Sequence, residues 1–164
     1  MSSSLRQAQV RLPKAKLSPV TALRPALRNA RTHSKKQIRQ IAKSIERFGF
    51  TSPLLVSDEL EVIAGAGRLL AAKQLGLSRV PVIRLSHLSQ AERRAYVIAD
   101  NQLAQNAGWD QELLAIELQG LLDIEFDVSV IGFETSELDI ILETLAEPAR
   151  DDDPSDLSVP ENGP

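Results

Sequence analysis

Apolar residues recur at helical spacing in several segments, and these segments begin and end at typical capping residues. Ser34, with Gln37 three positions later, has the capping-box pattern, and the helix that it begins is predicted to end at Gly49. A second capping box at Ser89 predicts a helix over about 90–106. The apolar positions that we expect this second helix to bury are Ala91, Ala95, Ile98, Ala99 and Leu103.

Two more helices are predicted toward the C-terminal end, and a short one near the middle of the chain. Asp110 is the predicted cap of one helix. Thr135 and Ser136 are predicted to cap the last helix, which ends near Leu145. The short helix covers residues 69–75.

Short apolar runs between the helices predict the strands of a small sheet. Residues 53–56 and 61–64 are separated by a polar turn and predict a hairpin. Residues 80–84 predict a further strand, and Pro81 favours an edge position because proline has no backbone N–H to donate. Residues 20–27, interrupted by proline, predict at best another edge strand. This order of strands and helices is typical of an α+β fold.

Charge is strongly polarised along the chain. Residues 1–50 carry twelve Lys/Arg and one acidic residue, whereas residues 101–164 carry one Lys/Arg and sixteen acidic residues. The basic half therefore suits a polyanion. We expect a flexible basic arm, a domain, a helical extension and a disordered acidic linker, at residues 1–17, 18–107, 108–146 and 147–164.

The composition excludes several classes of protein. The 164 residues include no cysteine, so disulfides, thiolate catalysis and Cys-ligated metals are excluded. Two histidines argue against a histidine-rich metal site. No apolar run approaches the roughly 20 residues that span a bilayer, and no secretory signal precedes the first helix. We expect a cytoplasmic protein.

The strongest candidate for chemistry is Gly65-Ala66-Gly67-Arg68, which joins a predicted strand to a predicted helix. Two glycines let the backbone approach an anion closely, and the N–H groups of the first helical turn point toward it. Arg68 adds a guanidinium suited to phosphate oxygens. The third glycine of the dinucleotide-binding pattern is absent, because position 70 is leucine. The alternative is a tight strand–helix turn in which Arg68 is solvated.

A second group of polar residues precedes the first long helix. Asn29, Arg31, His33 and Ser34 gather a carboxamide, a guanidinium, an imidazole and a hydroxyl at this helix N-terminus. Such an end favours negative charge, so it is a second candidate for anion binding. The alternative is an ordinary capped loop with a solvated histidine.

A third candidate is the Asp100-Asn101 pair, late in the 90–106 helix. Oxygen ligands suit Mg²⁺, which takes few ligands from the protein and the rest from phosphates and waters. The alternative is a solvated polar face of the helix.

In combination, these motifs resemble the ParB/sulfiredoxin superfamily, specifically its phage-type and DNA-methyltransferase-associated ParB-like domains. The resemblance covers residues 20–145 and implies a small mixed sheet with flanking helices, followed by a helical extension. The segments that carry it are Asn29-Ala-Arg-Thr-His33, Phe48 to Val56, Val62 to Ala72, Leu75-Gly-Leu with Val80-Pro-Val82, and Ala99-Asp-Asn-Gln-Leu103.

The resemblance implies binding of CTP or ATP with Mg²⁺, because partition-type members bind a nucleoside triphosphate. Their phosphate loop, Gly-x-Arg-Arg, matches Gly65 to Arg68, with Gly67 in place of the first arginine. Their Glu-Asn pair, which faces the metal and phosphates, matches Asp100-Asn101. Phage-type members usually have histidine where this chain has Ala66.

The family's Asn-Pro-x-x-Pro-Arg segment is matched only in part. Asn29 is kept, while Ala30 and His33 replace the prolines and Ser34 replaces the arginine. Arg31 would substitute for that arginine from a shifted position. The catalytic cysteine of sulfiredoxin is absent, which excludes that activity.

DNA is the expected partner, together with the nucleotide. Backbone phosphates would be contacted without base specificity by the basic face of the 34–48 helix, at Lys35, Lys36, Arg39 and Lys43. We do not expect a helix-turn-helix over residues 110–145, because about a dozen residues separate the two helices, where that motif has a turn of three or four. We therefore expect the protein to be associated with nucleoid or phage DNA.

The subgroup also implies a DNA methyltransferase domain as a partner, covalently linked or not, and a homodimer is a further possibility. Since the chain ends inside the predicted linker, we expect a fragment of a longer protein. Two other functions stay open: a ParB-like nuclease or nucleotide-dependent phosphotransferase, and a protein-interaction domain without a ligand. Against the nuclease, the sequence shows no tight carboxylate cluster with a partnering lysine.

Overall fold

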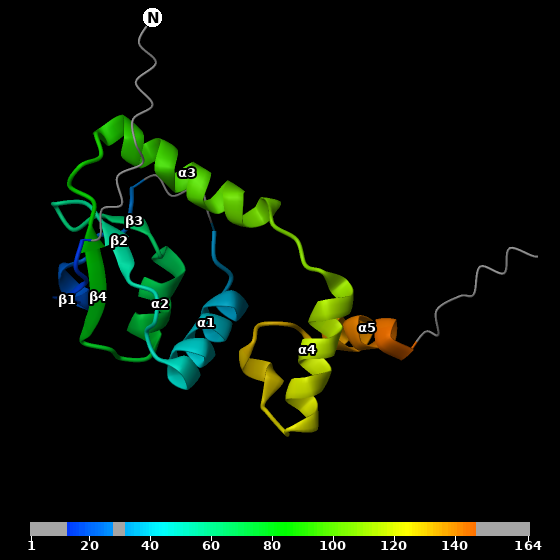
Figure 1. The fold of residues 1–164 in the computed structure, drawn as a ribbon. Helices are drawn as coiled ribbons and strands as arrows, with labels where there is room; N and C mark the ends of the chain where they lie inside the picture. Colours follow the sequence, from blue (N-terminus) through cyan, green and yellow to red (C-terminus); the bar gives the residue numbers. More distant parts are fainter. Residues whose placement is uncertain (1–12, 28–31, 147–164) are drawn as a thin grey trace, which may run out of the picture. The chain divides into compact units, whose positions relative to one another are not determined.

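The computed structural model describes residues 13–27 and 32–146, which form two compact units (Figure 1). The first unit comprises the described residues up to Gly108 together with the short segment Val130–Gly132. The second unit comprises the other described residues from Trp109 onward. The predicted acidic linker and most of the predicted basic arm lie outside the described residues. Within those residues, no helix has the length and apolar character needed to cross a bilayer.

The first unit is built on a mixed sheet of four strands in the order β1-β4-β2-β3. Its strands are β1 (Lys16–Pro19), β2 (Leu54–Val56), β3 (Val62–Ala64) and β4 (Arg79–Arg84). Strand β4 pairs antiparallel with β1 and parallel with β2, and β2 pairs antiparallel with β3 as the predicted hairpin. The predicted α+β fold with a small mixed sheet is confirmed.

The prediction that Pro81 places its strand at an edge is wrong, because β4 lies between β1 and β2. Pro81 pairs with Leu17 of β1, but the pairing with β2 begins one residue later, at Val82 opposite Leu54. Pro81 therefore has one neighbouring strand, and its missing N–H falls before the β2–β4 ladder begins.

The first strand lies earlier in the chain than predicted. Strand β1 begins two residues inside the predicted arm, and the predicted strand over 20–27 instead contains a 3-10 turn, η1 (Val20–Ala22), and a single bridge between Arg24 and Glu61. Proline at both ends of this segment limits its pairing, and Val20 turns into the core.

Three helices accompany the sheet: α1 (Lys35–Phe48), α2 (Ala66–Gln74) and α3 (Gln90–Asn106). Helix α1 packs against α2, and α3 contacts β3 (Figure 1). The core joins side chains of the sheet, α2 and the η1 segment. Each valine or leucine side chain that is fully buried contributes about 1.5–3 kcal/mol. Its members are Val20, Leu23, Leu54, Val56, Val62, Leu69, Ala72, Val80 and Val82.

The predicted inner face of α3 is wrong. The positions expected to be buried are all exposed, and they are Ala91, Ala95, Ile98, Ala99 and Leu103. The half-buried positions are Arg93, Tyr96, Val97 and Asn101. Both sets have helical spacing, so periodicity alone does not decide which stripe turns inward; here the polar-rich stripe does. The capping box of Ser89 and Glu92 forms as predicted.

The second unit contains helices α4 (Gln111–Asp123) and α5 (Thr135–Ala146). A 3-10 turn, η2 (Val128–Val130), lies on the connection between them, and its last residue belongs to the first unit. Asp110 caps α4 as predicted, by accepting a hydrogen bond from the N–H of Leu113. Thr135 and Ser136 do not cap α5, because the helix begins at Thr135. The buried residues that join α4 to α5 are Ala115, Leu118 and Ile141.

Candidate functional site

The turn from β3 into α2 requires glycine at position 65. Gly65 has φ +100° and ψ 24°, a left-handed conformation that other residues rarely adopt. A Cβ atom there would lie 2.5 Å from Cδ2 of Leu54 and 2.8 Å from the Nη2 atom of Arg68. The glycine therefore serves a close approach between this turn, β2 and the arginine.

Helix α2 begins at Ala66, three residues earlier than predicted, so that Gly67 and Arg68 belong to its first turn. Gly67 is buried, and a Cβ atom on it would lie 2.9 Å from Cδ1 of Ile41 and 3.0 Å from Cε1 of His33. The second glycine thus allows α1 and the imidazole of His33 to pack directly against the start of α2.

Arg68 is half-buried, and its guanidinium is satisfied only in part. Its Nη2 atom donates to the carbonyl oxygen of Pro53 at 3.2 Å, while its buried Nε atom has no partner among the described residues. Burial lowers the pKa of Arg68, and the nearby carboxylate of Asp100 opposes that change. An arginine remains charged despite such a shift, so a cation with an unsatisfied donor lies in the first turn of α2.

The start of α1 presents His33 toward α2. Ser34 caps α1 by accepting a hydrogen bond from the N–H of Gln37 at 3.1 Å. The predicted return bond from the Gln37 side chain to the cap does not form as expected, because the Oε1 atom of Gln37 accepts from Nδ1 of His33 at 3.1 Å. The half-buried imidazole is held between Gln37 and Gly67.

A cavity of about 210 Å³ brings the candidate groups together. Of the predicted residues it is lined by His33, Gly65, Ala66, Gly67, Arg68, Asp100 and Asn101. Ser34 does not line it, since its hydroxyl caps α1. Asn29 and Arg31 lie outside the described residues, and the basic side chains of Lys35, Lys36, Arg39 and Lys43 are exposed on α1.

Several lining residues were not predicted from the sequence, and Gln37 is the most informative of them. It lies four residues after His33, in the first turn of α1, and this short separation is the signal that identifies it in retrospect. Ile41 and Val97 also line the cavity and supply apolar contacts.

Asp100 and Asn101 reach the cavity from α3. Asn101 donates through Nδ2 to the carbonyl oxygen of Val97 at 2.7 Å, which fixes the orientation of its carboxamide. Burial raises the pKa of Tyr96, and the carboxylate of Asp100 raises it further, so this hydroxyl stays protonated beside Asp100. The described residues include no group of three or more His, Cys, Asp or Glu side chains placed to hold a metal ion.

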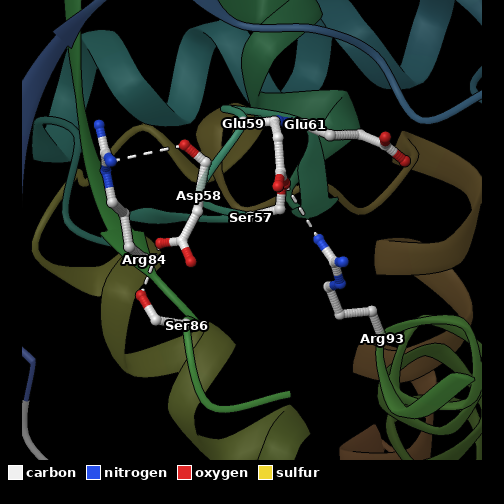
Figure 2. A network of polar contacts seen from close by, with 7 residues as sticks. All are labelled: Ser57, Asp58, Glu59, Glu61, Arg84, Ser86 and Arg93. Carbon is white, nitrogen blue, oxygen red and sulfur yellow. Dashed lines mark hydrogen bonds and ion pairs between the residues drawn. The ribbon is translucent and has the colours of Figure 1, made fainter. Parts of the chain in front are cut away.

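A polar network ties the β2–β3 turn to the end of β4 and to the first half of α3 (Figure 2). Asp58 accepts a 2.6 Å hydrogen bond from the hydroxyl of Ser86, and Glu59 forms an ion pair with Arg93 at 3.3 Å. The backbone N–H of Glu61 donates to the hydroxyl of buried Ser57. Because α3 buries no residue completely, these contacts help to set the position from which it presents Asp100.

The Glu59–Arg93 contact makes a testable contribution to stability. The pKa of Glu59 is lowered, first by its own backbone N–H, then by Ser57 and Arg93. A carboxylate with a lowered pKa stabilises the fold above its unfolded pKa, and this contribution disappears as pH falls through the folded value. We expect Glu59→Gln to lower the free energy of unfolding at pH 7, and the difference from wild type to diminish as pH falls below the ordinary pKa of glutamate and through the lowered pKa of Glu59. Urea unfolding measures it, and a difference independent of pH would contradict the prediction.

Comparisons with known proteins show the family. A model described as "ParB N-terminal domain" matches residues 3–102, and the chain belongs to this family. A second model, "ParB-methyltransferase HTH domain", matches residues 112–164. The predicted resemblance to ParB-like domains is thus confirmed.

The second match contradicts our prediction that this part of the chain is not a helix-turn-helix domain. The connection between α4 and α5, residues 124–134, nevertheless has the length that the sequence predicted. The structure therefore does not show the three- or four-residue turn of that motif between α4 and α5.

One relative and two solved structures are similar to this chain. The "ParB-like nuclease domain-containing protein YnaK" of Escherichia coli (strain K12) is 45% identical over 76 residues, which are 46% of this chain and 87% of that protein. The chromosome-partitioning protein ParB of Caulobacter crescentus, complexed with CTP-gamma-S, has a TM-score of 0.69 at 24% identity, over 83% of this chain and 81% of that one. Sulfiredoxin from Arabidopsis thaliana gives a TM-score of 0.44 at 20% identity, over 52% and 98% of the two chains.

Proposed function

We propose that this chain binds a nucleoside triphosphate, CTP or ATP, together with Mg²⁺, as a DNA-associated ParB-like domain. The observation that carries the proposal is the convergence of the α2 N-terminus, Arg68, His33 and the Asp100–Asn101 pair on one cavity. The description of a ParB protein of the same fold as complexed with CTP-gamma-S supports this choice of ligand.

The phosphates fit at the start of α2. The N–H of Leu69 already bonds to the carbonyl oxygen of Gly65, so the N–H groups of Ala66, Gly67 and Arg68 remain for an anion. A phosphate oxygen would also satisfy the buried Nε atom of Arg68. At about 210 Å³ the cavity is smaller than the roughly 300–1,000 Å³ of a typical ligand pocket, so it suits phosphates and a cation, with the base and ribose outside it.

The donor set for a metal fits Mg²⁺ in the presence of phosphates. Asp100 and Asn101 supply one carboxylate and one carboxamide at the cavity, and Mg²⁺ commonly takes one or two carboxylates plus substrate phosphates and waters. When bound, the ion would neutralise phosphate charge, and Asp100 and Asn101 would be the residues that hold it.

Calorimetry on the full chain with CTP, ATP and GTP, with and without Mg²⁺, tests the proposal. We expect binding that Mg²⁺ strengthens, and we expect Asp100→Asn to remove most of that strengthening, because a neutral amide replaces the charged ligand. Glu92→Gln, which neutralises an exposed carboxylate on the same helix, is the matched control and should leave the Mg²⁺ effect unchanged. Failure of every triphosphate to bind would refute the proposed function.

DNA is the proposed second partner. The exposed basic face of α1, comprising Lys35, Lys36, Arg39 and Lys43, suits backbone phosphates, contacts that carry no sequence information directly. The match to a ParB-methyltransferase HTH domain supports association with DNA and with a methyltransferase domain. A second copy of the chain, in a homodimer, is a further proposed partner.

A nuclease is the second candidate, and the name of the E. coli relative, a ParB-like nuclease domain-containing protein, favours it. Incubating plasmid DNA with the protein and Mg²⁺ tests whether the chain is a nuclease or only a nucleotide-binding domain. Cleavage that Asp100→Asn abolishes would favour the nuclease, whereas cleavage that persists in the variant would assign it to a contaminant.

A further inference from the structure

His33 lies where it can contact a ligand bound at the start of α2. Its Cε1 and Nδ1 atoms are 3.0 Å and 3.1 Å from the position that a Cβ atom on Gly67 would occupy. No side chain at position 67 therefore separates the imidazole from the first turn of the helix. His33 and Arg68 line the same cavity, and both belong to the region proposed for the phosphates.

Gln37 determines which nitrogen of His33 is left for a ligand. A carboxamide oxygen only accepts hydrogen bonds, so the 3.1 Å contact between Nδ1 of His33 and Oε1 of Gln37 corresponds to the tautomer in which Nδ1 carries the proton. A neutral imidazole has one donor and one acceptor, and Nε2 is then the acceptor with a lone pair. A phosphate oxygen also presents lone pairs, so it can bond to Nε2 only when that nitrogen carries a proton.

Of the side chains that line the cavity, His33, Arg68 and Asp100 are ionisable. Arg68 from α2 opposes a positive charge on His33, Asp100 from α3 favours it, and Lys35 and Lys36 follow in the first turn of α1. Tyr96, beside Asp100, stays neutral. Between about pH 6 and 8.5 only histidine among these residue types changes its charge.

We propose that His33 is a proton-linked phosphate ligand, so that binding of the triphosphate takes up a proton on Nε2 and strengthens as pH falls. This inference rests on the proposed function. It gives the site one permanent cation, Arg68, and one whose charge depends on pH. A phosphate bound between them receives a second charge-assisted hydrogen bond only in the protonated state.

Calorimetry with Mg²⁺ and CTP or ATP, in buffers of different ionisation enthalpy, counts the protons taken up. The ligand's own terminal phosphate titrates with a second pKa near 6, so the informative quantity is the difference between wild type and His33→Gln. We expect wild type to take up more protons near pH 7. Its dissociation constant should fall more steeply with decreasing pH than that of His33→Gln, by up to about tenfold per pH unit for one proton.

Two results separate this inference from the proposed function. Equal proton uptake and equal pH dependence in wild type and His33→Gln would overturn the role of His33 while leaving nucleotide binding intact. Absence of binding at every pH would overturn the proposed function itself.

Gln37→Glu provides a second variant if His33→Gln folds poorly. A carboxylate facing Nδ1 favours the protonated imidazole before any ligand arrives, so proton uptake on binding should fall below that of wild type. Unchanged uptake in a folded Gln37→Glu protein would also contradict the proposal.

Discussion

Gly65→Ala is expected to destabilise the first unit by about 2–5 kcal/mol, the combined cost of a strained left-handed residue and an overpacked contact. The strain arises because Gly65 has φ +100°. The overpacking arises because the new Cβ atom would lie 2.5 Å from Cδ2 of Leu54, a side chain that is itself completely buried. Urea unfolding of the full chain measures the loss in free energy.

Gly76→Ala separates these two causes. Gly76 also has a positive φ, +69°, but a Cβ atom on it meets nothing within 4 Å. Its substitution should therefore cost only the conformational part, about 1–2 kcal/mol. An equal loss for Gly65→Ala and Gly76→Ala would show that the close approach to Leu54 does not matter, and that the turn is free to move away from β2.

The helix caps and the hairpin were predictable because they depend on short-range chemistry. Ser34, Ser89 and Asp110 each accept a hydrogen bond from a backbone N–H three residues later, as their side chains allow. Those interactions need no knowledge of the rest of the fold. Strand order does need it, and Pro81 shows why: whether its missing N–H matters depends on where β2 begins to pair, which the local sequence does not contain.

The inner face of α3 shows the same limit for burial. Apolar spacing favoured the stripe through Ile98 and Leu103, yet these side chains are 66% and 69% exposed. The stripe through Tyr96 and Asn101 turns inward because one side of it reaches the cavity and the other meets the β2–β3 turn through Arg93. Polar contacts rather than apolar area orient this helix, and a hydrophobicity pattern does not reveal them.

The candidate site was partly predictable for a related reason. The strand–glycine–arginine–helix pattern identified Gly65 to Arg68 from local rules about anion binding. The convergence of Asp100 from α3 on the same cavity is a tertiary fact, and the resemblance to a family anticipated it where spacing alone did not. The partnership of His33 with Gln37 needed the structure, because the same glutamine had a plausible alternative use in the cap.

Arg68→Ala is expected to weaken triphosphate binding by about 1.5–3 kcal/mol, the range for hydrogen bonds to charged groups. The guanidinium lies in the first turn of α2, where it combines with the helix N-terminus, and its Nε atom is buried without a partner until a ligand supplies one. Removing it should alter stability less than affinity, because the lost bond to Pro53 is offset by the loss of an unsatisfied buried donor.

Arg68→Lys is the matched variant for this effect. It keeps the positive charge but has no Nε donor and no planar fork, so we expect it to recover only part of the lost affinity. Calorimetry at one pH and one Mg²⁺ concentration measures all three proteins, and urea unfolding checks that each is folded. Full recovery by lysine would show that charge alone acts at this position. Unchanged affinity in Arg68→Ala would place the phosphates away from α2 and would remove the basis for assigning the cavity to them.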